Sequence, residues 1–347
     1  MFDVAIIGAG VAGLTVGQQL RQAGYRVVVV EKSRGVGGRV ATRRLYDTRA
    51  DHGLRYLEGK GEFLQGLVKI LCDRQVLKLW TDKIYQFSPN SQISTSCYIA
   101  PEGMSAVAKF LASGLEVWLN HRVESIILNN PVCWQLNFAA NNDELPKSLM
   151  AKAVVVAIPA PQALMLLESL ISQEVLARLR AIEFDPCITV MAGYSSSCQC
   201  DRPEKAVVFP ESDRLAWIGL DSSKRSNSTS PVFVIQSSAK FAQLYLDAED
   251  LQLAGRELLA SAATHWLSWL DSPEWFQVHR WRYAFPRLPL AEMFLDTQTS
   301  LPLICCGDWC GGNLLESALQ SGLSTAERIN SQLQNLSLPG VHFFDSL

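Results

Sequence analysis

Short apolar runs and amphipathic stretches alternate at the N-terminal end of the chain. Residues 2–7 and 25–30 are largely apolar segments, typical of strands that are buried on both faces of a parallel sheet. The stretch between them places Leu14, Val16 and Leu20 on one side and polar residues on the other, and Gly24 supplies a C-terminal stop. This order predicts a β-α-β unit.

The same strand pattern returns late in the chain, whereas the middle differs. Residues 152–159 are a predicted strand, and so is the stretch from residue 301 that ends at Gly307-Asp308, which precedes a helix with an apolar stripe. The intervening region holds amphipathic helices, strand-like stretches and a Ser-rich polar loop at 221–230. We predict a two-lobed α/β fold, with a Rossmann-type parallel sheet and an inserted α+β substrate lobe. The first lobe is assigned to residues 1–56, 97–165 and 296–347, and the second to residues 57–96 and 166–295.

Length and composition agree with two lobes and limit the partners. The 347 residues exceed the size at which one core stops growing, and 48% of them are hydrophobic. The net charge of −3 gives no electrostatic reason to bind nucleic acid. The start has no signal-peptide pattern and no apolar run reaches the length of a membrane span. We therefore expect a cytoplasmic protein that acts on a small molecule.

The nine cysteines are an odd number scattered along the chain, which favours reduced thiols over a disulfide framework. Two clusters, Cys198/Cys200 and Cys305/Cys306/Cys310, raise the question of a metal. Neither cluster combines a CxxC with a second CxxC or with spaced histidines. We predict no metal site.

A glycine motif follows the first predicted strand and opens the first predicted helix. Gly8, Gly10 and Gly13 form GxGxxG, which provides a tight turn, a close approach to a pyrophosphate and close helix packing. The N–H groups at the helix start, including those of Val11 and Ala12, favour phosphate binding. Glu31 ends the next strand, where a carboxylate accepts hydrogen bonds from both ribose hydroxyls. The motif therefore predicts a dinucleotide site.

A second glycine cluster follows directly. Gly37 and Gly38 offer further backbone N–H groups to the same pyrophosphate, and Arg39 adds a guanidinium. A simple nicotinamide dehydrogenase does not need this second cluster. With Lys32 and Thr42, these residues resemble the N-terminal signature of the glutathione-reductase-like FAD enzymes of the amine-oxidase type.

The C-terminal end carries a matching pattern. In that family a Gly-Asp or Gly-Glu pair after a late strand reaches the flavin ribityl chain, and a Gly-rich helix start lies under the isoalloxazine ring. The corresponding residues here are Gly307, Asp308, Gly312, Asn313 and Leu314. The resemblance implies noncovalently bound FAD, and it also implies that the chain passes close to the flavin at Gly53.

Four stretches resemble the renalase-like branch of the family most: GGRVATRR…DHGLRYL, PEGMSAVAKFLA, HRWRYAFP and CGDWCGGNLLESALQSG. The resemblance implies oxidation of isomeric NAD(P)H, with electrons passing from FAD to oxygen. Two alternatives stay open: a flavin amine oxidase or desaturase-like enzyme, and a flavin-free escort protein of the same fold. The strand candidate 184–194 has no lysine of the kind that many amine oxidases place near the flavin.

Residues 277–285 alternate as a strand with an aromatic face. Trp281 and Tyr283 share that face and are candidates for stacking on a nicotinamide, with a neighbouring arginine for a phosphate. His279 lies on the same face as a candidate general base. Hydride transfer from a dihydropyridine needs no proton abstraction, and a lone histidine is more often structural. Packing of the second lobe is the competing interpretation of the whole strand.

Overall fold

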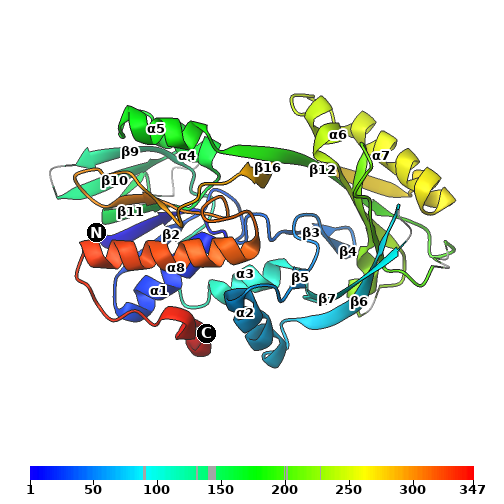
Figure 1. The fold of residues 1–347 in the computed structure, drawn as a ribbon, viewed down its shortest axis with the longest axis horizontal. Helices are drawn as coiled ribbons and strands as arrows, with labels where there is room; N and C mark the ends of the chain where they lie inside the picture. Colours follow the sequence, from blue (N-terminus) through cyan, green and yellow to red (C-terminus); the bar gives the residue numbers. More distant parts are fainter. Residues whose placement is uncertain (89–90, 130–131, 140–145, 199, 201, 227) are drawn as a thin grey trace.

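The structure is a computed structural model that describes the chain except residues 89–90, 130–131, 140–145, 199, 201 and 227. Its strands build two eight-stranded sheets and a small two-stranded hairpin. The sheets lie at opposite ends of the long axis (Figure 1). The α/β fold with a Rossmann-type sheet and a second, mixed sheet is therefore confirmed. The residue boundaries of the two lobes stay predictions.

The first sheet has a parallel centre and antiparallel additions at its margins. Its path runs β17-β18-β11-β1-β2-β8, and β10 joins β9 to β11. Register pairs Ile6 with Val155 on one side and with Val29 on the other. The strands are β1 (Phe2–Ile7), β2 (Val27–Val30), β8 (Glu116–Trp118), β9 (Val123–Asn129), β10 (Cys133–Phe138), β11 (Ser148–Val156), β17 (Leu295–Asp296) and β18 (Leu303–Cys305).

Helices cover both faces of the first sheet, which explains its continuous apolar strands. On one face, alternate β1 residues such as Val4 and Ile6 share a core with helices α1, α3 and α8. On the other face, Ala5 and Ile7 share a core with α4 and α5. The helices are α1 (Val11–Ala23), α2 (Glu62–Asp73), α3 (Ser105–Leu111), α4 (Ala160–Leu167), α5 (Gln173–Arg180) and α8 (Leu315–Gln332).

The second sheet runs in the order β16-β12-β15-β14-β13-β6-β7-β5. Its strands are β5 (Leu57–Glu58), β6 (Lys78–Gln86), β7 (Ser91–Ile99), β12 (Glu183–Gly193), β13 (Ala206–Val208), β14 (Leu215–Leu220), β15 (Val232–Ser237) and β16 (Trp275–Leu288). One face packs on α6 (Ala239–Leu244) and α7 (Gln252–His265), with Ile188 and Ile235 in that core. The short 3-10 helices are η1 (Asp221–Lys224), η2 (Ser268–Asp271) and η3 (Gly340–Ser346).

The other face of the second sheet is covered by a hairpin from the N-terminal part of the chain. Strands β3 (Thr42–Leu45) and β4 (Thr48–Asp51) form this hairpin. Leu45 and Ala50 pack there against Met191 of β12 and neighbouring β15 residues. The hairpin thus carries the chain from the glycine clusters to the second sheet.

Ser226, Ser228 and Thr229 are exposed, as expected for the predicted polar loop 221–230, but residues 221–225 differ from that expectation. They begin with the 3-10 helix η1, and Asp221 and Lys224 are 1% and 3% exposed. The serines fit because their hydroxyls bind locally: Ser223 donates to the Leu220 carbonyl, and Ser222 accepts from the N–H of Val232. The polarity of residues 221–225 therefore serves a buried cluster of charges.

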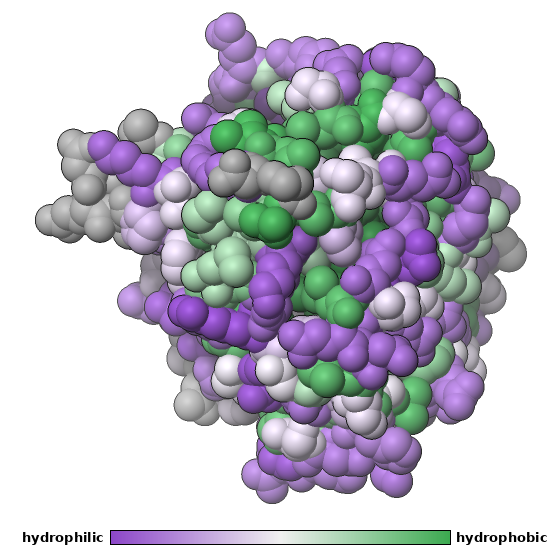
Figure 2. Space-filling view, turned by 90° about the vertical axis from the view of Figure 1, so that its left-hand side faces the viewer, coloured by the Kyte–Doolittle hydropathy of each residue, from purple (hydrophilic) through white to green (hydrophobic). Residues whose placement is uncertain are grey.

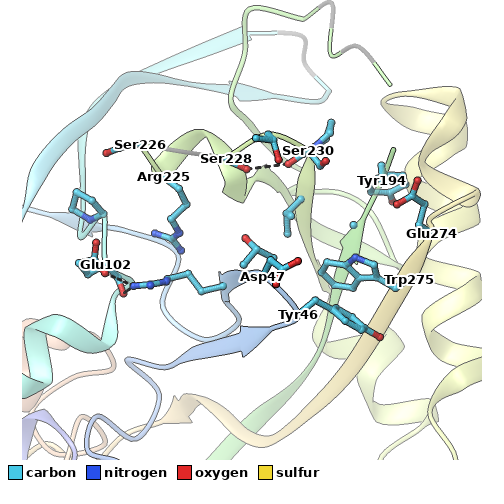
Figure 3. Close-up of a pocket in the computed structure, with 17 residues that line it drawn as sticks. Tyr46, Asp47, Glu102, Tyr194, Arg225, Ser226, Ser228, Ser230, Glu274 and Trp275 are labelled. Carbon is cyan, nitrogen blue, oxygen red and sulfur yellow. Dashed lines mark hydrogen bonds and ion pairs between the residues drawn. The ribbon is translucent and has the colours of Figure 1, made fainter. Parts of the chain in front are cut away.

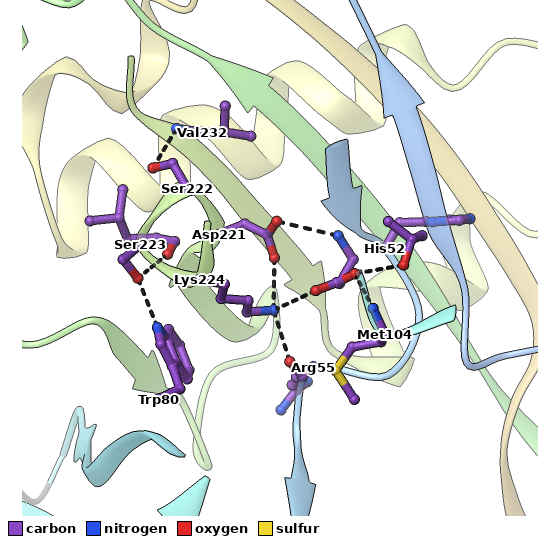
Figure 4. Close-up of polar contacts among 12 residues, drawn as sticks. His52, Arg55, Trp80, Met104, Asp221, Ser222, Ser223, Lys224 and Val232 are labelled. Carbon is purple, nitrogen blue, oxygen red and sulfur yellow. Dashed lines mark hydrogen bonds and ion pairs between the residues drawn. The ribbon is translucent and has the colours of Figure 1, made fainter. Parts of the chain in front are cut away.

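That buried cluster, which we call the ion cluster, consists of Asp51, Asp221, Lys224 and Arg225. Figure 4 shows the contact between Asp221 and Lys224 within it. Asp51 lies 2.7 Å from Arg225 and 3.3 Å from Lys224, and Asp221 binds both cations as well. The second Asp51 oxygen accepts from the Thr42 hydroxyl and the Met104 N–H. The ion cluster therefore fastens the end of β4 to η1.

Charge compensation decides the protonation of Asp51. Burial alone would raise the pKa of this carboxyl, but the charges of Lys224 and Arg225 outweigh it and hold the pKa below the usual 3.8. A carboxyl with a lowered pKa stabilises the folded state above its unfolded pKa. That contribution is lost as pH falls through the folded pKa, so Asp51 supports the fold at neutral pH.

No described helix is long and apolar enough to cross a membrane. Figure 2 shows the end of the molecule nearest the first sheet, where apolar side chains lie among polar ones. Strands β9–β11 and their connections include the exposed apolar residues Ile127, Leu128, Val132 and Met150. Scattered apolar residues of this kind are normal on a protein surface.

We predict that Asp51→Asn lowers the free energy of unfolding by about 3–5 kcal/mol, because it leaves two buried cations short of one carboxylate. Urea unfolding at neutral pH measures the change. The control is Asp213→Asn, which removes an exposed partner of Lys240 and should change stability by less than about 0.5 kcal/mol. Equal effects of the two substitutions would contradict the role of the ion cluster.

Candidate active site

The first glycine motif has the geometry that close approach requires. Gly8 has a φ of +106°, and a Cβ there would lie 2.5 Å from the Ala157 carbonyl oxygen. A Cβ at Gly13 would overlap the carbonyl oxygen of Gly8. At Gly10, by contrast, a Cβ would meet nothing within 4 Å. Gly8 and Gly13 are therefore fixed by packing, whereas Gly10 faces open space.

The start of α1 borders that space. Gly10 is its N-cap residue, and Val11 and Ala12 are its first helical residues, whose N–H groups lack intrahelical acceptors. The Glu31 carboxylate accepts hydrogen bonds from the N–H groups of Ala9 and Ser33, both at 2.9 Å. Glu31 is thus held directly beside the glycine turn, at the end of β2.

The second glycine cluster lies against the first. Gly37 donates its N–H to the Ala9 carbonyl at 2.8 Å, and a Cβ at Gly38 would lie 3.6 Å from the Gly10 Cα. Gly37 and Gly38 have φ values of +124° and +56°, which favour glycine. The two clusters therefore form one backbone surface around Gly10.

Arg39 joins the N-terminal and C-terminal parts of the predicted site. Its guanidinium forms an ion pair with Asp308 at 2.6 Å and donates to the Ala284 carbonyl of β16 at 3.1 Å. The neighbouring Gly307 donates its N–H to the Ser321 hydroxyl of α8. Residues from both ends of the chain and from the second sheet thus meet at one guanidinium.

Other predicted cofactor residues lie at different places. Lys32 is exposed and donates to the Gln162 side chain, and Thr42 connects Asp51 to the Ser105 N–H at the start of α3. Asn313 and Leu314 are exposed residues just before α8. A Cβ at Gly312 would overlap the Ser317 hydroxyl, so this glycine permits the tight start of α8.

Residues 51–56, which we call the linking segment, pass between the glycine clusters and the second sheet. A Cβ at Gly53 would overlap the Arg39 carbonyl oxygen and would lie 3.3 Å from the Trp281 ring. Leu54 donates its N–H to the same Arg39 carbonyl at 2.9 Å. Gly53 is therefore a point of close contact between the two halves of the molecule.

The linking segment crosses a row of side chains on four neighbouring strands. We define the cross-strand row as His279, Thr189, Gln236 and Trp217, which are register partners from β16 to β14. Such partners share one face of a sheet. Gln236 donates to the Gly53 carbonyl at 2.9 Å, and its side-chain oxygen accepts from Arg55 at 2.5 Å. The row and the segment are hydrogen-bonded together.

Three rings meet beside Gly53. His52 stacks on Trp281 with ring centroids 5.2 Å apart, and His279 contacts both rings edge-on at 4.9 and 4.4 Å. The Trp281 indole donates to the His52 carbonyl at 2.9 Å.

Burial, with smaller effects of His279 and Arg43, lowers the pKa of His52 to about 3. Burial and then Arg43 lower the pKa of His279 to about 4, so both imidazoles are neutral at pH 7.

The predicted alternation along β16 holds up to Trp281 and is then interrupted. Register shifts between the pairs Cys187–Trp281 and Asp185–Phe285, and Tyr283 lies inside this irregularity. Tyr283 contacts Phe184 edge-on, with ring centroids 5.7 Å apart. A β-bulge of this kind is not visible in the polar pattern, so the sequence misses it.

Arg280 and Arg282 of β16 face away from the three rings. Arg280 donates to the carbonyls of Tyr245 and Ala248, and Arg282 pairs with Asp247. These contacts lie at the C-terminal end of α6, where cations stabilise free carbonyl groups. The structure therefore uses both arginines for packing and does not place them for a substrate phosphate.

A pocket of about 390 Å³ lies beside the β3–β4 hairpin, away from the glycine clusters (Figure 3). Tyr46 and Trp275 form its aromatic side, with ring centroids 5.0 Å apart, and Arg225 and Glu102 also line it. It contains neither Gly53 nor the cross-strand row. We therefore assign no part of the chemistry to it.

Two protein-family models match the chain. The NAD(P)-binding Rossmann-like domain matches residues 6–71, and the flavin-containing amine oxidoreductase model matches residues 57–330. The chain belongs to the flavin-containing amine oxidoreductase family. Membership of this family implies FAD as the cofactor, which agrees with the glycine clusters and the C-terminal Gly-Asp pair.

Relatives add detail about the N-terminal part and the fold. L-amino-acid oxidases of Siganus canaliculatus and Crotalus adamanteus are 56% identical over 41 residues and 42% identical over 66 residues. These stretches cover 12% and 19% of this chain and only 8% and 13% of those proteins. Structures of putrescine oxidase and of cyclohexylamine oxidase from Brevibacterium oxydans IH-35A have TM-scores of 0.70 and 0.71, each at 14% identity. They cover 95% and 96% of this chain and 99% of their own, and show the same fold.

The residues around Gly10 fit FAD. The open space at Gly10, the free N–H groups of α1 and the adjoining Gly38 form a cradle that suits a pyrophosphate. Glu31 at the strand end suits a ribose. The Arg39–Asp308 pair lies between this cradle and β16, where it supplies both a cation and a carboxylate.

Several site residues were not found from the sequence. Gln236 lies in the buried strand β15, where a polar side chain inside an apolar run is a usable signal. His52, Arg55 and Trp217 gave no such signal, because their importance depends on long-range register between strands. The proximity of Gly53 to the flavin stays a prediction from the sequence, which did not identify the neighbours of Gly53.

We predict that Gly10→Val leaves apoprotein stability nearly unchanged but abolishes FAD binding, because the new side chain fills open space that the pyrophosphate needs. Gly13→Ala should instead unfold the protein at lower temperature, since its Cβ overlaps Gly8. Thermal unfolding of the apoproteins and flavin absorbance after reconstitution distinguish the two. Normal FAD binding by Gly10→Val would contradict the assignment of the cradle.

We predict that the free energy of unfolding falls by about 2 kcal/mol between pH 7.5 and pH 5 through His52 alone. Its pKa of about 3 is below the usual 6.5, so the unfolded state takes up a proton first. This loss begins as pH falls through 6.5 and should be reduced in His52→Gln. The exposed His342→Gln is the control, and equal pH dependence in both variants would contradict the prediction.

Proposed function

We propose that this protein is a renalase-like FAD-dependent oxidase that acts on isomeric dihydronicotinamides. The family gives the flavin chemistry, and the sequence resemblance of the stretches around Gly53 and Trp281 gives the substrate class. The supporting observation is that the neutral rings of His52, His279 and Trp281 lie beside Gly53, together with cations that form no ion pair with a carboxylate of the described residues. That set suits a planar, anionic substrate better than a cationic amine.

The charge around the linking segment carries this argument. Its own Asp51 and the adjacent Asp221 are both bound to Lys224 and Arg225, so neither carboxylate is free to attract an ammonium group. Arg43 donates to Gln277 and forms no ion pair within the described residues. The electrostatic balance of this region is therefore positive, which favours anions.

The roles of the site residues follow from their positions. Trp281 and His52 present a stacked pair of rings beside Gly53, which orients a planar substrate. His279 is neutral and does not need to move a proton, because a dihydropyridine loses a hydride directly. Bound FAD supplies the acceptor of that hydride, and we propose oxygen as the final electron acceptor.

Oxidation of an amine or amino acid is the second candidate. The relatives named above are L-amino-acid, putrescine and cyclohexylamine oxidases, and the family as a whole oxidises amines. Such substrates would need a neutral amine at the reacting carbon, which the neutral imidazoles of His52 and His279 tolerate. The comparisons favour this candidate, whereas the local charge favours the first.

Anaerobic flavin spectra discriminate between the two. We predict that NADH enriched in its minor dihydro isomers bleaches the flavin rapidly, in proportion to the isomers present, and that putrescine and cyclohexylamine do not. Ordinary NADH is the matched control. Bleaching by an amine or by L-leucine, without bleaching by the isomers, would instead establish the second candidate.

A further inference from the structure

Arg55 is a partly buried cation to which no role has been assigned so far. Its side chain is only partly exposed, and its neighbours Gln236 and Trp217 are 3% and 2% exposed. Its Nε donates to Gln236, and its guanidinium carbon lies 4.8 Å from the centre of the Trp217 ring. Within the described part of the chain, no carboxylate pairs with it.

Arg43 also forms no ion pair within the described residues, but the other cations near Arg55 are compensated. Lys224 and Arg225 each contact two carboxylates of the ion cluster, and Arg39 pairs with Asp308. The Arg55 side chain forms no such ion pair with any residue that the structure describes. Its backbone is nevertheless held, because Lys224 donates to the Arg55 carbonyl oxygen at 2.8 Å. The fold therefore holds the Arg55 backbone firmly and leaves the charge of its side chain without a counter-ion.

Neighbouring titratable groups do not neutralise this charge. Burial raises the pKa of the Cys187 thiol, with Arg55 opposing the rise, so the thiol stays protonated at pH 7. Burial also raises the pKa of Tyr56, which keeps its phenol neutral. Burial lowers the pKa of Arg55 itself, because removing a cation from water costs free energy. A bound anion would remove that cost.

Further aromatic rings lie around Trp217, the ring that the Arg55 guanidinium contacts. Tyr56 and Trp80 lie 5.6 and 6.5 Å from Trp217, ring centroid to centroid. Gln236 connects Arg55 to Gly53, and therefore to the ring set of His52 and Trp281. An anionic group at Arg55 would thus be carried by a molecule that also reaches the cross-strand row.

We propose that Arg55 is the anion-binding residue of the substrate site, and that it holds a phosphate or carboxylate group of the substrate while the reacting ring lies near Gly53. The free ends of its guanidinium offer the paired donors that bind such groups in a bidentate manner. Gln236 is its positioning residue, and Trp217 supports the guanidinium from one face. This inference rests on the proposed function in locating the reaction at the cross-strand row.

Pairs of substrates that differ in one anionic group test the proposal. The first pair is isomeric dihydronicotinamide mononucleotide and its riboside, which lacks the phosphate. The second pair is L-leucine and 3-methylbutylamine, which lacks the carboxylate. For each compound, the half-saturating concentration and the limiting rate of anaerobic flavin bleaching are measured in the wild type, Arg55→Gln and Arg55→Lys.

We expect Arg55→Gln to raise the half-saturating concentration for the anionic member of the active pair on the order of tenfold to a hundredfold. The uncharged or amine member should be unaffected, and Arg55→Lys should recover part of the binding. Arg282→Gln is the matched control, since that arginine faces Asp247 on the other side of β16. The pair of compounds that bleaches the flavin shows whether the bound anionic group is a phosphate or a carboxylate.

A binding measurement keeps the test independent of turnover. Benzoate, an aromatic carboxylate with no oxidisable amine, should raise the thermal midpoint of the FAD-loaded wild type and of Arg282→Gln, but not of Arg55→Gln. If no compound bleaches the flavin but benzoate binds in this way, the proposed function fails and the role of Arg55 stands. The role of Arg55 is overturned if Arg55→Gln changes both members of a pair equally, or if benzoate does not distinguish the variants.

Discussion

The buried contacts of Asp51 with Lys224 and Arg225 fix the place where the two halves of the molecule meet. Asp51 ends β4, and the cations belong to and follow η1 in the second half of the sequence. Because each charge depends on the others for compensation, none of them can leave the cluster without leaving a buried charge behind. The ion cluster therefore determines where the linking segment begins and which face of the second sheet it crosses.

The linking segment connects the ion cluster to the residues of the candidate active site. Its Gly53 touches the Arg39 carbonyl next to the second glycine cluster, and its His52 and Arg55 contact opposite ends of the cross-strand row. The six residues of the linking segment thereby contact the second glycine cluster and the neutral rings, and they include the cation Arg55, which has no counter-ion among the described residues. The flavin supplies a chemistry common to the family, and we propose that the substrate is selected by the residues that the linking segment brings together.

The sequence predicts the parts of this arrangement that depend on local order. Gly8, Gly10 and Gly13 are recognisable because strand, turn and helix follow one another within one β-α-β unit, and the structure confirms that unit. The partnership of Arg55 with Gln236 and Trp217 was not predictable, since it needs the register of β14 and β15. The burial of residues 221–225 within the predicted polar loop was missed for the same reason, because the charges of Lys224 and Arg225 are compensated by the distant Asp51.

A crystal structure of the protein loaded with FAD tests most directly whether the linking segment joins the cofactor cradle to the cross-strand row. The account predicts a pyrophosphate at Gly10 and Gly38, and a flavin ring that reaches Gly53 with Asp51 still bound to Lys224 and Arg225. A flavin ring remote from Gly53 and from the cross-strand row, or an ion cluster that opens when FAD binds, would contradict it.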